Sequence, residues 1–332
     1  MAADDSVPDV VLLTNLPKNG WYEGSTTRPN GHILATRVLE PELHDFDPEQ
    51  PDEPPRLVHT FPDANTAVYI TPLKGCHDEY VVYSAYVEFD SIEISNYVVW
   101  RVAFRGYDDE QPTVTRIATL PDAGCCMGCL SVTERTLLIS DSYKDHIWLL
   151  DISTGKISIF LADDTMRKTG EGKTGRFGIC AMRINGDYIW FANASVGTLC
   201  RIPIALEDDG AGWGIRTTGP VEIVADDVPN TNGLVLMEDA SAAYCVDYND
   251  GMLRQVRIDP KTGKGETRVI VEDLISPTVM ELVHSRSDGR PKLGIICSGK
   301  LDDSSSPLEG RGSISVTETI TIVTEDGDEI IP

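Results

Sequence analysis

The clearest copy of a repeated sequence pattern is Ile184-Asn185-Gly186-Asp187-Tyr188-Ile189-Trp190-Phe191-Ala192-Asn193-Ala194-Ser195. It consists of a polar turn, a short apolar strand and an end of small or polar residues. The same phrase recurs at residues 29–36, 77–84, 133–140, 238–245 and 287–296. Copies spaced by roughly 40 to 60 residues are typical of β-propellers and other repeat architectures. The repeat therefore predicts a propeller.

Residues between the copies also favour β-structure. β-Branched and aromatic residues alternate with polar ones over short runs, as in half-buried strands, and helical periodicity is weak. Four strands for each copy predict an all-β, six-bladed β-propeller with four antiparallel strands per blade. We expect a single domain with blades at about 20–61, 62–120, 121–162, 175–225, 228–272 and 275–332. An apolar strand at 9–14 should complete the last blade and close the ring, which hides the exposed sheet edges.

Two connections carry a specific expectation. Residues 151–156 have Gly155 in the turn between two apolar runs, which predicts a β-hairpin. The insert at 87–96 is long for a hairpin connection, which predicts a functional or mobile loop.

The charge of the chain limits its partners. The 332 residues include 53 Asp and Glu against 28 Lys and Arg, a formal net charge of −25. Such a surface repels phosphate backbones, so we expect no nucleic-acid partner. The charge indicates solubility, with attraction of a cationic substrate as the alternative.

No targeting or membrane segment is visible. No stretch reaches the roughly 18 uninterrupted apolar residues of a membrane helix. The acidic start, residues 1–5, lacks the basic and apolar regions of a secretory signal. We therefore expect no membrane span and a cytoplasmic location unless a leader has been removed, with a monomer and a homodimer equally compatible.

Eight cysteines are too sparse for a disulfide-built fold. Cys126 and Cys129 form a Cys-x-x-Cys pattern, but a zinc site would need a second pair or suitably spaced histidines. We expect small buried hydrophobic residues, with a disulfide or redox role as the alternative.

One face of a propeller should hold the site. The loops that enter the inner strands and those that leave the second strands lie on the same face, where a ligand pocket belongs. Residues expected there include Glu23, Asn65, Cys129, Tyr143, Asn193, Asn232, Tyr248 and Thr278.

Two motifs resemble a known superfamily. Trp21-Tyr22-Glu23-Gly24 is similar to the first-blade motif of the gluconolactonase, regucalcin and senescence-marker superfamily. Asn232-Gly233-Leu234, followed by Tyr244-Cys245-Val246-Asp247, is similar to its later Asn-Gly blade. The resemblance extends over nearly the whole chain.

Within this superfamily the chain resembles fungal members. The similar segments are Pro121-Asp122-Ala123-Gly124, residues 138–142, residues 151–156, residues 197–204 and Gly219-Pro220-Val221-Glu222. That branch includes hetero-Diels–Alderases of secondary metabolism, which join a tropolone quinone methide to a cyclic sesquiterpene. The resemblance therefore implies a pericyclase.

The metal site of the superfamily is only half matched. Its lactonases hold a divalent cation with a Glu, an Asn and an Asp from three inner strands. Glu23 and Asn232 match the first two, but no carboxylate occurs near Thr278 and no Asn near Phe177. Because a hard cation prefers roughly six to eight oxygen ligands, we expect no metal and no cofactor.

The function expected from this reading is metal-independent cyclisation of apolar small molecules. The enzyme would orient both partners and hydrogen-bond a polarised carbonyl group. Glu23 is the candidate acid or base, and the expected catalytic set is Glu23, Asn232, Thr278 and Tyr248. The expected substrate-binding set is Trp21, Tyr22, Asn65, Met127, Cys129, Tyr143, Phe177, Asn193 and Met280. The alternatives are a metal-dependent lactonase or hydrolase and a non-catalytic binding propeller.

Overall fold

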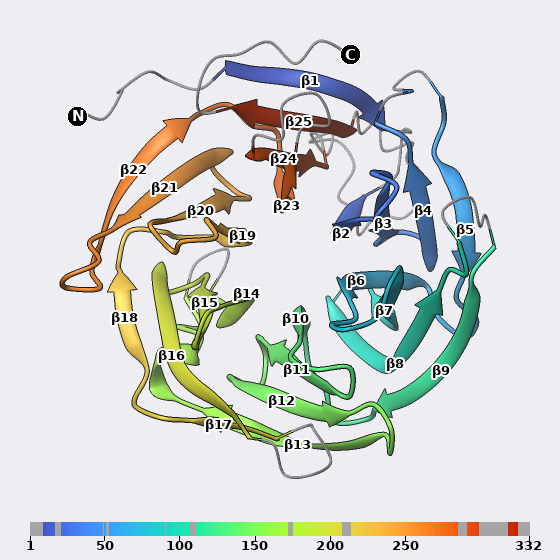
Figure 1. Cartoon of the computed structure of the whole chain (residues 1–332), viewed down its shortest axis with the longest axis horizontal. Coiled ribbons are helices and arrows are strands. Elements are labelled where there is room, and N and C mark those ends of the chain that lie inside the picture. Colours follow the sequence, from blue (N-terminus) through green and yellow to red (C-terminus); the bar gives the residue numbers. More distant parts are fainter. Residues whose placement is uncertain are drawn as a thin grey trace.

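The described strands form a ring of antiparallel sheets (Figure 1). The computed structural model describes residues 9–16, 21–48, 50, 53–89, 91–106, 111–171, 175–207, 214–284, 291–298 and 318–324. These residues form six sheets and one short 3₁₀ turn, η1 (Asp164–Met166). The prediction of an all-β, antiparallel propeller is confirmed.

Each sheet runs outward from the centre of the ring. The innermost strands are β2 (Tyr22–Thr27), β6 (Thr66–Pro72), β10 (Cys126–Ser131), β14 (Ile179–Asn185), β19 (Thr231–Leu236) and β23 (Pro277–His284). The second strands are β3 (Ile33–Arg37), β7 (Glu79–Glu88), β11 (Thr136–Asp141), β15 (Tyr188–Asn193), β20 (Ala242–Asp247) and β24 (Pro291–Cys297).

The remaining strands form the outer part of the ring. The third strands are β4 (Glu42–Phe46), β8 (Glu93–Ala103), β12 (His146–Asp151), β16 (Thr198–Glu207), β21 (Met252–Ile258) and β25 (Glu318–Thr324). The outer strands are β1 (Asp9–Leu16), β5 (Arg56–Thr60), β9 (Thr113–Leu120), β13 (Lys156–Ala162), β17 (Gly214–Thr217), β18 (Glu222–Ala225) and β22 (Gly265–Val271). β1 pairs antiparallel with β25, so the N-terminal strand lies in the same sheet as the last strands of the chain.

One sheet departs from the expected four strands. β16 pairs with β18 along residues 199–201 and with β17 along residues 204–207, so this sheet contains five strands. The long third strand exposes two successive lengths of edge, and the chain covers each with a separate short strand.

The hairpin predictions have different outcomes. β12 and β13 meet at Asp151 and Lys156, with the Gly155 amide donating to the Asp151 carbonyl at 2.8 Å, as predicted. Within the insert at 87–96, for which a functional or mobile loop is expected, β7 and β8 remain paired as far as Glu88 and Glu93. Register on this hairpin shifts between Ser84 and Tyr86, and the two strands extend beyond the rest of their sheet.

The repeated phrase forms the second strands. In the copy at 184–195, Gly186 makes the turn with a φ of 54°, a conformation that costs little without a Cβ atom. β15 then buries Trp190 and Phe191, whose side chains are 1% and 0% exposed. The copy at 287–296 and the expected blade at 275–332 lie partly outside the described residues.

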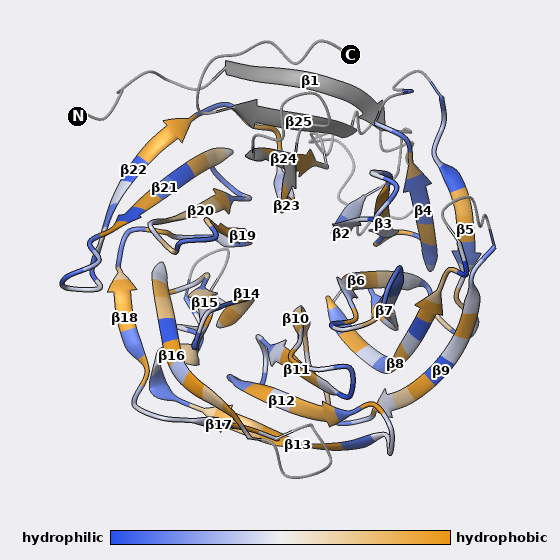
Figure 2. Ribbon diagram, in the orientation of Figure 1, coloured by the Kyte–Doolittle hydropathy of each residue, from blue (hydrophilic) through white to orange (hydrophobic). Residues whose placement is uncertain are grey.

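Apolar side chains fill the space between neighbouring sheets. Figure 2 shows hydrophobic and hydrophilic residues alternating along many strands. Separate buried clusters join each sheet to the next around the ring. The cluster that joins the first sheet to the last contains Tyr22, Ile33, Ala35, Phe46, Val279 and Ile296.

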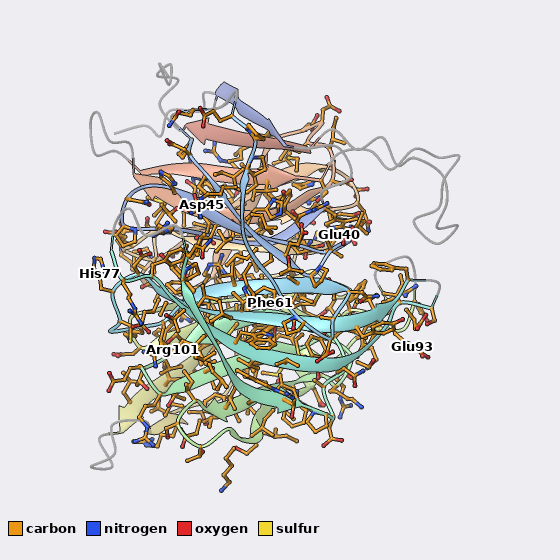
Figure 3. All side chains as sticks on the ribbon, turned by 90° about the vertical axis from the view of Figure 1, so that its right-hand side faces the viewer. Glu40, Asp45, Phe61, His77, Glu93 and Arg101 are labelled. Carbon is orange, nitrogen blue, oxygen red and sulfur yellow. The ribbon has the colours of Figure 1, made fainter. Side chains whose placement is uncertain are left out.

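The two faces of the ring differ in what they carry. Figure 3 shows Glu40 and Glu93 on one side and His77 on the other.

All eight cysteines lie within the described residues, where they are free thiols and seven are buried. The prediction of buried, unpaired cysteines is thus confirmed for all but the half-buried Cys76. The described part of the chain contains no helix with the length and apolar character needed to cross a membrane.

Candidate functional site

A β-bulge near the start of every innermost strand builds the site. In each case the pairing with the second strand shifts register and passes over one or two residues. A bulge leaves such a residue without a cross-strand partner and redirects its side chain. The residues passed over are Glu23, Val68, Met127, Cys180 with Ala181, Asn232 and Thr278, and all of them line one cavity.

The cavity is large and mostly apolar. It encloses about 380 Å³. Its apolar walls come from Trp21, Val38, Leu39, Val68, Val87, Phe89, Ile92, Ile94, Met127, Phe177, Ala181, Ala194, Leu234 and Val279. It opens on the side of Glu40 and Glu93, whose neighbours Leu39, Ile92 and Ile94 belong to the wall (Figure 3). Such a space suits an apolar ligand with few polar groups.

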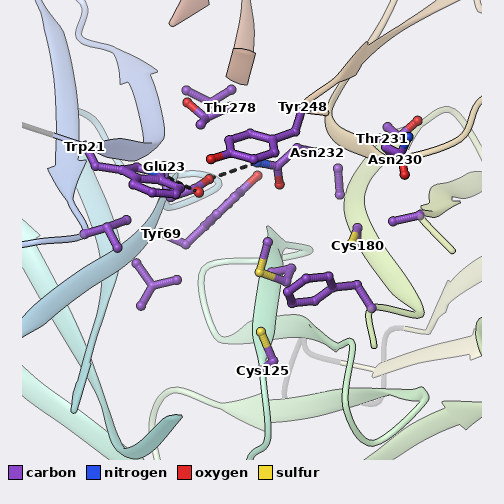
Figure 4. Close-up of a pocket in the computed structure, with 18 of the residues that line it drawn as sticks. Trp21, Glu23, Tyr69, Cys125, Cys180, Asn230, Thr231, Asn232, Tyr248 and Thr278 are labelled. Carbon is purple, nitrogen blue, oxygen red and sulfur yellow. Dashed lines mark hydrogen bonds between the residues drawn. The ribbon is translucent and has the colours of Figure 1, made fainter. Parts of the chain in front are cut away.

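The Glu23 carboxyl group and its hydrogen-bond donors form one polar cluster in the cavity wall (Figure 4). The Trp21 indole N–H donates to Glu23 Oε1 at 2.8 Å, and the Asn232 amide donates to Glu23 Oε2 at 3.1 Å. The rings of Trp21 and Tyr248 stack with their centroids 5.8 Å apart. Both carboxyl oxygens of Glu23 therefore have a fixed donor.

The environment of Glu23 changes its acidity. Burial raises the pKa of Glu23 from 4.5 to about 7, and the hydrogen bonds from Trp21 and Asn232 oppose that rise. A carboxyl group with this pKa exchanges a proton readily near neutral pH, as a general acid or base must.

A second polar group crosses the floor of the cavity. Arg183 on β14 donates to the Tyr69 hydroxyl on β6 at 3.1 Å and to the Met280 carbonyl on β23 at 3.1 Å. Its guanidinium also lies 3.7 Å from the Glu281 carboxylate. Burial raises the pKa of Glu281 to about 7, against the effect of Arg183. Three inner strands are thus joined by one side chain.

Two thiols lie across the cavity from Glu23. Cys125 and Cys180 belong to the lining (Figure 4). Burial raises the pKa of Cys180 to about 11 and raises that of Cys125 well above its usual value. Both therefore remain protonated at neutral pH and are weak nucleophiles.

About half of the expected site residues line the cavity. Seven of them line it, namely Trp21, Glu23, Met127, Phe177, Asn232, Tyr248 and Thr278. Thr278 contributes little polarity, because its hydroxyl donates to the Tyr22 carbonyl at 2.6 Å.

Three expected substrate-binding residues lie in the hydrophobic core instead. Tyr22, Cys129 and Met280 are at most 2% exposed. Tyr22 packs edge-on against Phe46, and its hydroxyl lies 2.9 Å from His44 Nδ1. These residues lie on innermost strands, as expected, but the residues that the bulges turn into the cavity on those strands are Glu23, Met127 and Thr278.

Three further expected residues hold loops in place. Asn65 makes two hydrogen bonds with the backbone of Val87. Asn193 is fully buried and donates to the carbonyls of Thr165 and Arg167. Tyr143 stacks on Phe177 and its hydroxyl donates to the Ile92 carbonyl at 3.3 Å. These polar atoms are occupied behind the cavity wall.

The residues present do not fit the divalent cation that the superfamily resemblance implies. Asn232 turns its N–H toward Glu23, and the Thr278 oxygen faces a carbonyl group. Among the described residues, no three His, Cys, Asp or Glu side chains gather as a metal site requires. A hard cation would need several further oxygen ligands.

Sequence reasoning missed Tyr69 and Arg183. A signal was present, since Arg183 is the single charged residue in the strand Ile179-Cys180-Ala181-Met182-Arg183-Ile184-Asn185. A charge on an innermost strand must either face the centre of the ring or be paired, because burial without a partner is costly.

Two known proteins are similar to this chain in sequence. No family model matches the chain. It is 26% identical over 226 residues to the Sarocladium schorii protein "Putative hetero-Diels-Alderase asR5", a match that covers 61% of this chain and 55% of that protein. It is 24% identical over 234 residues to a "Putative hetero-Diels-Alderase" of a Phoma species, covering 63% of this chain and 64% of the relative. The chain thus spans less than two thirds of either relative.

Solved structures agree on the fold. A glucose dehydrogenase superposes with a TM-score of 0.60 at 10% identity, covering 96% of this chain and 100% of that one. A luciferin-regenerating enzyme superposes with a TM-score of 0.55 at 14% identity, covering 96% of each chain. At such low identity these similarities support a propeller fold alone. The chain is therefore a propeller with distant relatives named as hetero-Diels–Alderases.

Proposed function

We propose that this protein is a metal-independent pericyclase, a hetero-Diels–Alderase of fungal secondary metabolism. Its substrates would be a tropolone quinone methide and an apolar cyclic sesquiterpene. The observation that carries the proposal is the mostly apolar cavity of about 380 Å³, with the Glu23 carboxyl group and its two hydrogen-bond donors in its wall. The names of the two relatives support the same reaction class.

The proposed scaffold is a single six-bladed domain. The six sheets would be its blades, at about 20–61, 62–120, 121–162, 175–225, 228–272 and 275–332. The β1–β25 pairing would close the ring. Because every sheet sends one or two bulged residues to the centre, a closed ring would hold the cavity walls at fixed positions.

Glu23 would assist formation of the quinone methide. In its protonated form it would give its proton to the hydroxyl group of a tropolone alcohol, the C–O bond would break, and water would leave. The ring hydroxyl would then lose its proton to the Glu23 carboxylate, which restores the acid. The pKa of about 7 leaves both forms of Glu23 populated near neutral pH.

The apolar walls would then bring about the cycloaddition. The heterodiene of the quinone methide and one alkene of the sesquiterpene would form a C–C and a C–O bond without any proton transfer. Holding both partners in one pose lowers the barrier through proximity and orientation. Trp21 stacked on Tyr248 offers a flat apolar surface for the tropolone ring, and Met127 and Phe177 face the remaining space.

The protonated thiols are compatible with this chemistry. A quinone methide is an electrophile that a thiolate would attack. The raised pKa values of Cys125 and Cys180 keep that competing reaction slow at neutral pH.

The test is incubation of the protein with a tropolone alcohol and a humulene-type sesquiterpene, followed by chiral chromatography and mass spectrometry. Wild type should form one stereoisomer of the adduct, with or without a chelator. Glu23→Gln should slow adduct formation by about 10²- to 10⁴-fold, the usual contribution of a general acid. Glu134→Gln, at an exposed turn position, is the matched control and should behave as wild type.

A second arm separates the two steps. When the quinone methide is generated chemically, Glu23→Gln should recover most of the selectivity, since only water loss needs the acid. Chelator-sensitive lactone hydrolysis without cyclisation would favour the metal-dependent alternative. Ligand binding without any turnover would favour a binding propeller.

A further inference from the structure

The hydroxyl group of Tyr69 is held in an unusual way. Tyr69 follows the bulged residue Val68 on β6 and lines the cavity. The only hydrogen bond that its hydroxyl group makes among the described residues is the one it accepts from Arg183 Nη1 at 3.1 Å. The hydroxyl proton therefore has no acceptor within the described part of the protein. Figure 4 shows the ring extending from β6 toward the side of the cavity that holds Glu23 and Asn232.

Arg183 is anchored so that it cannot easily turn away. Besides Tyr69, it donates to the carbonyls of Met182 and Met280 at 3.0 and 3.1 Å. Its side chain is only 21% exposed and faces Glu281 at 3.7 Å. A cation held beside a phenol oxygen withdraws electron density from the O–H bond and makes it a stronger donor.

Tyr69 also lies close to the proposed acid. A Cβ atom added to Gly24, the residue after Glu23, would come within 2.8 Å of the Tyr69 Cα atom. β2 and β6 thus run side by side at this point, and Glu23 and Tyr69 belong to adjacent innermost strands. Burial raises the pKa of Tyr69, with Arg183 opposing the rise, so the hydroxyl keeps its proton at neutral pH.

We propose that Tyr69 is a second catalytic residue, which donates a hydrogen bond to the carbonyl oxygen of the bound ligand, and that Arg183 is the residue that positions it. The ligand class is then an apolar, conjugated ketone that carries one oxygen toward the floor of the cavity. The inference rests on the proposed function for the role of that oxygen, which is the heteroatom of the diene. Donation to it would polarise the diene where charge develops in the transition state.

The test compares two probes of the same shape. Fluorene and 9-fluorenone share one ring skeleton, and only the ketone can accept a hydrogen bond. We expect wild type to bind 9-fluorenone about tenfold more tightly than fluorene in equilibrium dialysis, which corresponds to about 1.4 kcal/mol. Tyr69→Phe should bind fluorene as wild type does and should lose the preference for the ketone.

An infrared measurement reports the hydrogen bond directly. The C=O stretch of 9-fluorenone should move to lower frequency when it binds wild type, and this shift should disappear in Tyr69→Phe. Arg183→Met should reduce the shift, and Arg183→Lys should restore part of it. A side chain that only braces the strands would leave the stretch unchanged, so this readout separates positioning from stability.

The matched control is Tyr83→Phe. Tyr83 pairs with Tyr69 across β6 and β7, is 1% exposed in the core, and lies outside the cavity lining. Removing the Tyr83 hydroxyl group should leave the ratio of the affinities for 9-fluorenone and fluorene, and the infrared shift, as in wild type. If Tyr69→Phe keeps the ketone preference, the inference is wrong, even where the protein still forms the adduct.

The same experiment distinguishes failure of the inference from failure of the proposed function. If the protein discriminates between the probes through Tyr69 but does not cyclise the tropolone substrates, Tyr69 is a hydrogen-bond donor and the proposed pericyclase function is wrong. If the protein cyclises them and Tyr69→Phe changes neither kcat nor KM, the pericyclase function stands and the role proposed for Tyr69 is wrong.

Discussion

Glu23 and Asn232 lie 209 positions apart in the chain, yet the Asn232 amide donates to the Glu23 carboxylate at 3.1 Å. The two residues occupy equivalent bulges on innermost strands β2 and β19. This contact lowers the pKa of a carboxyl group that burial has raised to about 7. Asn232 thereby adjusts the acidity of the group on which the proposed reaction depends.

Asn232→Ala should raise the pKa of Glu23 above about 7, because one of the two donors to the carboxylate is lost. The measurement is a carboxyl ¹³C titration in protein labelled at glutamate, with the Glu23→Gln spectrum used for assignment. Asn65→Ala is the control, since that amide binds the Val87 backbone instead. A lower pKa in Asn232→Ala would contradict the role given to Asn232.

Glu23→Gln should make the stability less dependent on pH. Because the pKa of Glu23 is higher in the folded protein than the usual 4.5, the folded state holds the proton more tightly. Wild type therefore loses stability as the pH rises from about 4.5 to about 7.

The variant, which resembles the protonated acid, should be more stable than wild type at pH 8 by about 1–3 kcal/mol and similar to it at pH 4. Denaturant unfolding at both pH values measures this difference. Glu134→Gln, an exposed charge change of the same size, should keep the pH dependence of wild type. Equal pH slopes for wild type and Glu23→Gln would show that Glu23 ionises normally.

Gly24→Ala should destabilise the fold. The added Cβ atom would lie 2.8 Å from both the Ile70 nitrogen and the Tyr69 Cα atom, and backbone cannot move aside cheaply. Overpacking of this kind costs about 1–3 kcal/mol. Urea unfolding provides the measurement. Gly106→Ala should change stability by less than about 0.5 kcal/mol, because among the described residues no atom beyond its chain neighbours lies within 4 Å of the added Cβ.

Arg28→Met should be more destabilising still. Arg28 is 3% exposed and binds the carboxylates of Asp45 and Asp78 at 3.0 and 2.8 Å, with its guanidinium 3.7 Å from the centre of the Phe104 ring. Its removal leaves two buried carboxylates without this partner, at a cost of about 3–5 kcal/mol.

Arg56 supplies the comparison for this cluster. Its side chain is 35% exposed and reaches the same Asp45 carboxylate at 2.8 Å. Arg56→Met should cost about 1 kcal/mol or less, because water replaces an exposed partner. Thermal unfolding of both variants distinguishes the two. Similar losses would mean that burial does not set the strength of these ion pairs.

The propeller fold could be predicted from the amino-acid sequence. Its repeated phrase places a turn before each second strand, and alternation along the strands depends only on local spacing. Motifs at strand starts likewise predict a pocket position for Trp21, Glu23 and Asn232, and the end of a second strand predicts one for Tyr248. All four residues line the cavity.

The tertiary structure alone decided which side chains face that cavity. A bulge changes the register by one residue and exchanges the two faces of a strand, so Tyr22 and Met280 lie in the core while Glu23 and Thr278 line the cavity. The link from Arg183 to Tyr69 and Met280 spans three blades, and no local pattern encodes such a contact. Only closing the sheets into a ring brings these distant side chains together, and their shared burial then sets their acidity.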